Sequence, residues 1–172
     1  SPSRGLGDVY KRQVTIPQTV TDIGAHAYLD CSNLENLILS EGVVNIGEGA
    51  FEECAITSLV IPKSVKSIGK SAFSSCNIKT LILPYSVTNI GSEAFVENND
   101  MMNIYYSGTK EQWSQIKGKI NIFSSSDSYK VYYNSNGPGS IPSVGASITD
   151  SVGREYRVIK SVSYTHLRAH ET

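Results

Sequence analysis

The segment Leu59-Val-Ile-Pro62, followed by Ile68-Gly69, Ala72-Phe73 and Cys76, decides the fold of this chain, because the same series of residues occurs four times. The other copies are Val14-Thr-Ile-Pro17 with Ile23-Gly24, Ala27-Tyr28 and Cys31; Leu37-Ile-Leu-Ser40 with Ile46-Gly47, Ala50-Phe51 and Cys54; and Leu81-Ile-Leu-Pro84 with Ile90-Gly91, Ala94-Phe95 and Asn98. The glycines are 23, 22 and 22 residues apart. A fixed period of this length is typical of repeat proteins.

Each repeat predicts one coil of a solenoid. In Leu59-Val60-Ile61 the first and third residues share a face of a short β-strand, and Pro62 ends the strand because it has no amide hydrogen. We expect Gly69, like Gly24, Gly47 and Gly91, to adopt a positive φ, and Ala72-Phe73 to form a short helical turn. One coil cannot stabilise itself, because about eight inward apolar groups do not offset the backbone entropy of about 22 residues. Stacked coils with a short parallel sheet along one side are therefore expected.

This pattern resembles the BspA-like (Treponema-type) leucine-rich repeat of bacterial surface proteins. The resemblance rests on the joint recurrence of the glycine, the Ala-Phe pair and the cysteine, and it extends from Val14 to about Asn98. It implies a leucine-rich repeat solenoid, an extracellular or cell-surface location, and a role in adhesion or protein recognition. Three residues depart from the pattern: Tyr28 in place of phenylalanine, Ser40 in place of proline, and Asn98 in place of the last cysteine.

Both ends of the chain are interpreted as translated sequencing adapter. Ser3–Gln13 reads SRGLGDVYKRQ and Val162–Thr172 reads VSYTHLRAHET. One possible coding of the first segment, reverse-complemented and read in a shifted frame, gives VSYTHLRAHE. We therefore expect residues 1–13 and 162–172 to be non-native, and exclude them from fold reasoning.

The rest of the chain is expected to contain four parts. Residues 14–103 form the repeat array of about four coils. Residues 104–133 form a C-terminal cap, in which Thr109-Lys-Glu-Gln112 predicts a capping box and Trp113 covers the open end of the stack. Residues 134–147, rich in Asn, Gly, Pro and Ser, form a linker. Residues 148–161 begin a following module that is truncated.

Composition removes several classes of function. The chain has 172 residues and a formal net charge of −1, which gives no electrostatic basis for binding nucleic acid. No apolar run approaches the roughly 20 residues of a membrane span. No cofactor motif is found, because Gly69-Lys70-Ser71 lacks the upstream glycine of a phosphate-binding loop.

Neither catalytic nor metal-binding residues are predicted. Cys31, Cys54 and Cys76 occupy one repeat position, so their side chains form a straight ladder and do not converge on a metal. We expect buried thiols, which serve as structural residues together with Gly47, Gly69 and Gly91, Phe51, Phe73 and Phe95, and Trp113. His26 is expected to be solvated. Since no nucleophile, base and carboxylate are grouped, the chain is predicted to be non-enzymatic.

The outward strand positions form the candidate binding surface. They carry Thr15, Ile38, Val60, Ile82 and Tyr105, beside an edge series of Glu35, Thr57, Lys79 and Met102. An apolar stripe with a polar edge is typical of partner-binding surfaces. The predicted binding residues are Glu35, Ile38, Val60, Lys79, Ile82 and Tyr105. An equally simple explanation is that β-branched residues suit parallel strands.

These observations predict a protein-binding or adhesion module of a bacterial cell-surface or secreted protein, with a protein ligand of unknown identity. Two alternatives remain open. The array could be a structural spacer that holds another domain away from the cell envelope, or an accessory array of a larger secreted enzyme.

Overall fold

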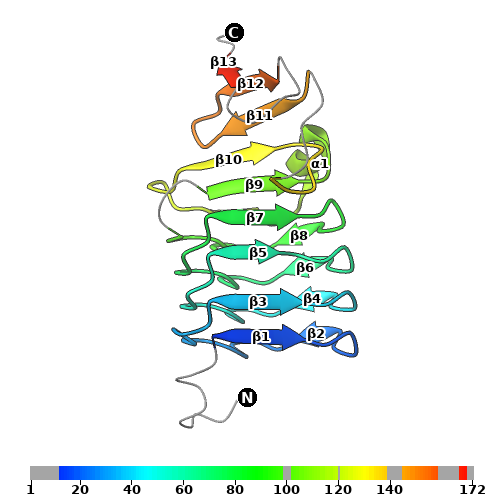
Figure 1. Ribbon diagram of the computed structural model, residues 1–172, viewed down its shortest axis with the longest axis vertical. Helices are drawn as coiled ribbons and strands as arrows, with labels where there is room; N and C mark the ends of the chain where they lie inside the picture. The colour runs from blue at the N-terminus through cyan, green and yellow to red at the C-terminus, as the bar shows by residue number, and fades with distance from the viewer. Residues whose placement is uncertain (1–11, 99–101, 120, 139–144, 159–166, 170–172) are drawn as a thin grey trace.

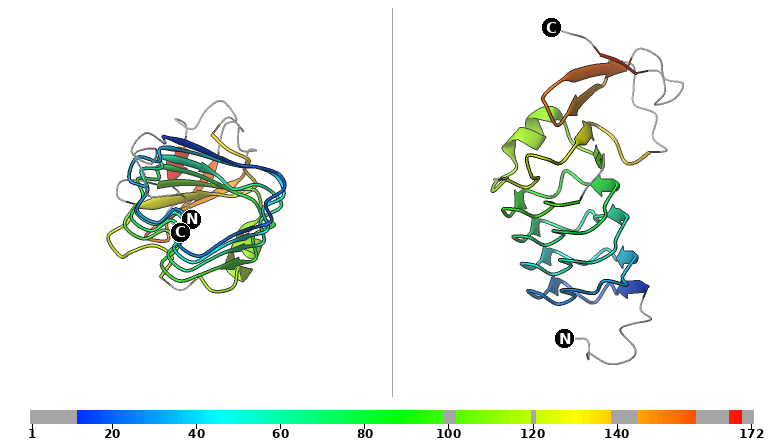
Figure 2. Two further views of the ribbon diagram at one scale, coloured as in Figure 1. Left: turned by 90° about the horizontal axis from the view of Figure 1, so that it is seen from below. Right: turned by 90° about the vertical axis from the view of Figure 1, so that its left-hand side faces the viewer.

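A computed structural model describes residues 12–98, 102–119, 121–138, 145–158 and 167–169. The chain winds into a β-solenoid whose coils lie one above another along the long axis, as Figure 1 shows. The view down the axis in Figure 2 shows that the successive coils overlie one another. The repeat array expected from the sequence is thus confirmed.

Each of the first four coils contributes one longer and one two-residue strand. The longer strands are β1 (Gln13–Ile16), β3 (Asn36–Leu39), β5 (Ser58–Val60) and β7 (Thr80–Leu83). The short ones are β2 (Asp22–Ile23), β4 (Asn45–Ile46), β6 (Ser67–Ile68) and β8 (Asn89–Ile90). The longer strands face one side of the solenoid, with β1–β3 as one parallel pair and β5–β7 continuing into a larger sheet. The short strands form a second parallel sheet in the order β2-β4-β6-β8, which corrects the expectation of a sheet on one side only.

The second sheet was missed because two residues per coil give no alternating pattern. Its inward positions are Ile23, Ile46, Ile68 and Ile90, all buried. Its outward positions are joined by polar side chains: the Asn45 amide donates to Asp22 Oδ1 over 2.7 Å, and the Ser67 hydroxyl donates to Asn45 Oδ1 over 2.7 Å. The bonds that Asp22 accepts from Asn45 and Thr21 lower its pKa.

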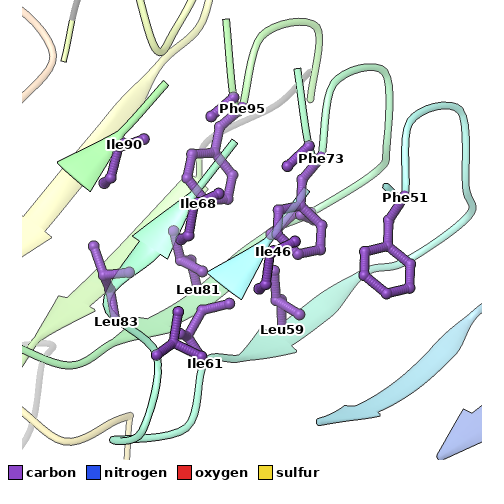
Figure 3. Packing of buried hydrophobic residues seen from close by; sticks show 14 of the residues in the cluster. Ile46, Phe51, Leu59, Ile61, Ile68, Phe73, Leu81, Leu83, Ile90 and Phe95 are labelled. Atoms are coloured by element: carbon purple, nitrogen blue, oxygen red, sulfur yellow. The ribbon is translucent and has the colours of Figure 1, made fainter. Parts of the chain in front are cut away.

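A column of stacked aromatic rings fills the centre of the coils. The ring centroids of Tyr28 and Phe51 lie 5.2 Å apart, those of Phe51 and Phe73 5.3 Å, and those of Phe73 and Phe95 5.6 Å, with interplanar angles of 4°, 7° and 6°. The three phenylalanines are buried, and Figure 3 shows them in one row beside Leu59 and Leu81. The predicted register of the repeats is confirmed.

Three of the four repeated glycines, Gly47, Gly69 and Gly91, are needed for close approach, and none of the four has a positive φ, so that prediction was wrong. A Cβ at Gly69 would lie 2.6 Å from the Glu48 backbone nitrogen of the preceding coil, and one at Gly91 would lie 2.4 Å from the nitrogen of Lys70. At Gly47 the nearest atom, the Ile23 carbonyl oxygen, would be 2.6 Å away. Neighbouring backbones therefore pass too closely for any side chain.

The residues with positive φ stand two positions further on. They are His26, Gly49, Ser71 and Glu93, with φ between 53° and 60°. A second set follows four residues later at Asp30, Glu53, Ser75 and Glu97. The segment between the two sets was expected to form a short helical turn, but it contains no helix. Its backbone amides bond to the next coil instead: Phe51 N–H donates to the Ala72 carbonyl over 2.8 Å, and Phe73 N–H to the Ala94 carbonyl over 2.9 Å.

The cysteine position serves as a hydrogen-bond donor between coils. Cys54 Sγ donates to the Tyr28 carbonyl at 3.3 Å and Cys76 Sγ to the Phe51 carbonyl at 3.1 Å. Asn98 continues the same contact, because its amide donates to the Phe73 carbonyl at 2.9 Å while its Oδ1 accepts from Ile78 N–H at 3.0 Å. The replacement of cysteine by asparagine in the last repeat thus preserves the bond and adds a second one.

The C-terminal part closes the stack with strand β9 (Met102–Tyr106), helix α1 (Lys110–Gln115) and strand β10 (Tyr129–Tyr132). The predicted capping box is present, since Thr109 and Gln112 exchange side-chain to backbone hydrogen bonds. Trp113 does not cover the aromatic column. It packs edge-on against Tyr106, with ring centroids 5.3 Å apart, and Lys119 Nζ lies over its ring. Phe123 continues the column instead, 6.2 Å from Phe95.

Two antiparallel strands, β11 (Ser147–Asp150) and β12 (Glu155–Val158), extend the larger sheet beyond β10, and β13 (Leu167–Ala169) pairs with β12. Lys110 of α1 and Glu155 form a salt bridge. An exposed sheet edge accepts many extended segments, so the pairing of β13 does not bear on the adapter origin predicted for 162–172. The predicted domain boundaries stay predictions, and residues 1–11 and 139–144 lie outside the described part of the chain.

Candidate functional site

The outward strand residues form a column that begins on the β1–β3 pair and continues on the larger sheet. Strand register places Thr15 beside Ile38 and Val60 beside Ile82, then Tyr105, Tyr132, Ile148 and Tyr156 in turn. We call this series the outward column. Its first four members stand on the first four coils, and its last four stand on β9, β10, β11 and β12.

Only the N-terminal half of the outward column is accessible. Ile38 and Val60 are 48% and 51% exposed. Ile82 is half-buried, and Tyr105 is only 6% exposed, because it stacks on Tyr132 at a centroid distance of 4.8 Å and packs with Ile148. The expectation that Tyr105 presents its ring to solvent was therefore wrong.

The chain covers this part of its own sheet face. A Cβ at Gly137 would lie 3.1 Å from Ile82 Cδ1, so the segment after β10 passes over the fourth coil. Ser135 N–H donates to the Tyr106 carbonyl at 2.9 Å, which holds the segment in place. Ala146 also packs on the cluster of Tyr105, Tyr132 and Ile148. Sequence patterning could not show this cover, because the segment has the composition of a linker.

The polar edge follows the prediction in three of its four positions. Glu35, Thr57 and Lys79 are exposed on successive coils, but Met102 is buried, 3% exposed. The exposed surface is thus Ile38 and Val60 with Glu35, Thr57 and Lys79 along one edge. We call these five residues the sheet-face patch. Whether they bind a partner stays a prediction.

A second candidate, which sequence reasoning missed, is a cleft between the fourth coil and α1. Its volume is about 630 Å³. Tyr85, exposed to 61%, stands on one wall, and Gln112, Gln115 and Lys117 come from the helix and the residues after it. The available signal was Tyr85 itself, because the equivalent positions of the other coils carry Gln18, Glu41 and Lys63.

The cysteines have the character of core residues. Burial raises the pKa of Cys76 to about 12 and also raises that of Cys54, so both thiols stay protonated at a pH where a free thiol ionises. Cys31 is half-buried. Within the described ranges no three His, Cys, Asp or Glu residues are grouped so as to hold a metal ion. His26 is exposed, as expected, and lies against Gly49 of the next coil.

Among the described residues, no helix has the length and apolar character needed to cross a membrane.

Coils of this period, with two sets of parallel strands and a buried aromatic column, define a leucine-rich repeat solenoid. The model of the BspA type leucine rich repeat region, described as six copies, matches residues 9–130. The chain therefore belongs to the family of BspA-type leucine-rich repeats. The match runs past residue 103, the predicted end of the array, into the cap.

Among solved structures, the chain is similar to a leucine rich cell surface protein from Faecalibacterium prausnitzii A2-165. The two share 18% sequence identity with a TM-score of 0.27. The alignment covers 83% of this chain and 44% of that protein, so the chain spans less than half of its length. A comparison with curated proteins gives no match.

Proposed function

We propose that the chain is a protein-binding module of a bacterial cell-surface or secreted protein, and that the sheet-face patch contacts the partner. Membership of the BspA-type family supports a surface repeat module. One observation supports this binding face: Ile38 and Val60 are about half-exposed, and the strands that carry them are held in place because their inward residues are buried in the core.

The apolar part of the patch is large enough to matter for affinity. Full burial of a Val or Ile side chain contributes about 1.5–3 kcal/mol, and each of these two is already half-buried. Covering the remaining surface of both would contribute about 1.5–3 kcal/mol, or about a 10- to 150-fold change in Kd. Glu35 and Lys79 carry opposite charges at the edge, where they would select the orientation of a partner more than they add affinity.

The face also limits the size of the site. The cover removes Ile82 and Tyr105 from the binding surface. A partner would therefore contact the second and third coils, with Lys79 at the edge of the fourth, and approach from the N-terminal side of that cover. Coils preceding Val14 in a longer protein would enlarge the same face.

The test compares three versions of the protein on beads: the unchanged chain, Ile38→Glu with Val60→Glu, and a control, Leu29→Glu with Val152→Glu. Leu29 and Val152 are also exposed apolar residues, 38% and 71%, but they lie outside the outward column. Each is incubated with solubilised cell-surface proteins, and circular dichroism checks that all three fold.

A protein retained by the unchanged chain and the control, and lost at least tenfold by the Ile38/Val60 variant, supports the proposal. Equal retention by all three would show that the partner does not bind at Ile38 and Val60. Retention of nothing would favour the structural spacer.

A further inference from the structure

The cleft beside Tyr85 lies on another part of the molecule from the sheet-face patch. It is bounded by the turn from Tyr85 to Asn89 in the fourth coil and by α1 with the residues that follow it. We call it the Tyr85 cleft. Its volume of about 630 Å³ falls within the range of about 300–1,000 Å³ typical of ligand sites.

Tyr85 breaks the repeat at the point where it meets the cleft. The equivalent residues Gln18, Glu41 and Lys63 are polar, as suits a turn in water. Tyr85 is 61% exposed, so its ring gains little from the core. Its backbone is nevertheless fixed, because Tyr85 N–H donates to Ser107 Oγ at 2.9 Å. Packing in the core therefore does not explain why this turn carries an aromatic ring.

The opposite wall is equally well held. Tyr106 is 1% exposed, and Trp113 packs edge-on against its ring. Gln112 is fixed by the capping box, in which its Oε1 accepts from Thr109 N–H at 2.8 Å, so its NH2 group is the part left to face a ligand. The cleft thus has rigid walls before any ligand enters, which lowers the entropic cost of binding.

The lining combines aromatic rings, amides and one cation. Amide groups are contributed by Asn89, Gln112 and Gln115, and the charge by Lys117. None of the residues that line the cleft is an aspartate or glutamate. Hydroxyl groups both donate and accept hydrogen bonds, as do amides, and the C–H face of a sugar ring packs on an exposed aromatic ring. The lysine favours an anion.

We propose that the Tyr85 cleft binds a short oligosaccharide that carries a carboxylate-bearing sugar, with a sugar ring stacked on Tyr85 and the carboxylate at Lys117. A peptide is the weaker fit, because such segments gain affinity from an open strand edge or an apolar groove, and the cleft is lined by turn and helix residues of mixed polarity. This site is additional to the proposed protein-binding face.

The experiment is binding of the full chain to an array of immobilised oligosaccharides, half of them neutral and half carrying sialic or uronic acid. Tyr85→Gln restores the polar residue type found at Gln18, and Tyr85→Phe keeps the ring. Lys117→Gln removes the charge. Lys63→Gln is the matched control, since Lys63 occupies the position of Tyr85 one coil earlier and does not line the cleft.

We expect acidic oligosaccharides to bind, with at least a tenfold loss in Tyr85→Gln and in Lys117→Gln and retention in Tyr85→Phe and Lys63→Gln. Because Tyr85 and Lys117 are exposed, all variants should unfold at the same temperature as the unchanged chain. The absence of any bound glycan, equal binding of neutral and acidic glycans, or binding unaffected by Tyr85→Gln would overturn the proposal. Variants of Ile38 and Val60 should leave glycan binding unchanged, so the two proposals fail separately.

Discussion

Alanine at Gly69 should destabilise the solenoid, whereas alanine at the equivalent Gly24 should not. A Cβ at Gly69 would come within 2.6–3.0 Å of three backbone atoms of the preceding coil, at Gly47 and Glu48. Neither Gly69 nor Gly24 has a positive φ. Overpacking of this kind costs about 1–3 kcal/mol. Alanine also restricts the unfolded chain, which offsets about 0.4–1 kcal/mol. The midpoints of these two ranges give a net loss of about 1.3 kcal/mol for Gly69→Ala.

Gly24 is the internal control, because a Cβ there would meet nothing within 4 Å. Only the unfolded-state effect remains, so Gly24→Ala should raise the free energy of unfolding by about 0.4–1 kcal/mol. The assay is urea denaturation followed by circular dichroism, with all three proteins at one pH. If the two variants changed stability by the same amount, the glycines would be needed for their backbone conformation and the crowding argument would be refuted.

Three further predictions concern single side chains. Asn98→Ala leaves Ile78 N–H and a carbonyl buried without partners, and should cost about 2–4 kcal/mol in urea denaturation, with part of the loss recovered by Asn98→Cys. Because burial raises the pKa of Cys76 from 9.0 to about 12, the folded state binds more protons between these values. The contribution of Cys76 to stability should therefore be constant below pH 9 and fall as the pH rises above it, and Cys76→Ala should weaken this alkaline fall. Thr109→Ala removes the helix cap and should lower the free energy of unfolding by about 1 kcal/mol.

The path of each coil and the register between coils could be predicted from the sequence, because both depend on the spacing of apolar residues in the repeat. Leu59 and Ile61 are buried while Val60 is exposed, and the phenylalanines stack as the repeat predicts. The capping box at Thr109 was equally visible, since it depends on residues three apart.

Contacts between neighbouring coils were predicted less well. The crowding at Gly69 comes from atoms of residues 47 and 48, about 22 positions away, and a glycine required for space cannot be told from one required for a positive φ by its type alone. Phe123 and Tyr129 continue the aromatic column although both lie outside the repeat.

The candidate surface was predicted in its position but not in its extent. Alternation identifies the outward residues Ile38, Val60, Ile82 and Tyr105 correctly. It carries no information about segments from elsewhere in the chain. The residues near Gly137 cover Ile82, and Tyr132, Ala146 and Ile148 pack with Tyr105. The Tyr85 cleft depends in the same way on a helix that begins 25 residues after Tyr85.

The stacking of successive coils in register is tested most directly by a double-mutant cycle on Phe51 and Phe73, each replaced by leucine. Their rings are stacked at 5.3 Å, and an aromatic pair contributes about 0.5–1.5 kcal/mol beyond its buried area. In-register coils predict that the double variant loses less stability than the two single variants together, by about that amount. The same cycle on Phe51 and Phe95, which are separated by Phe73, should be closer to additive. Additive losses for Phe51 and Phe73 would contradict the stacked column.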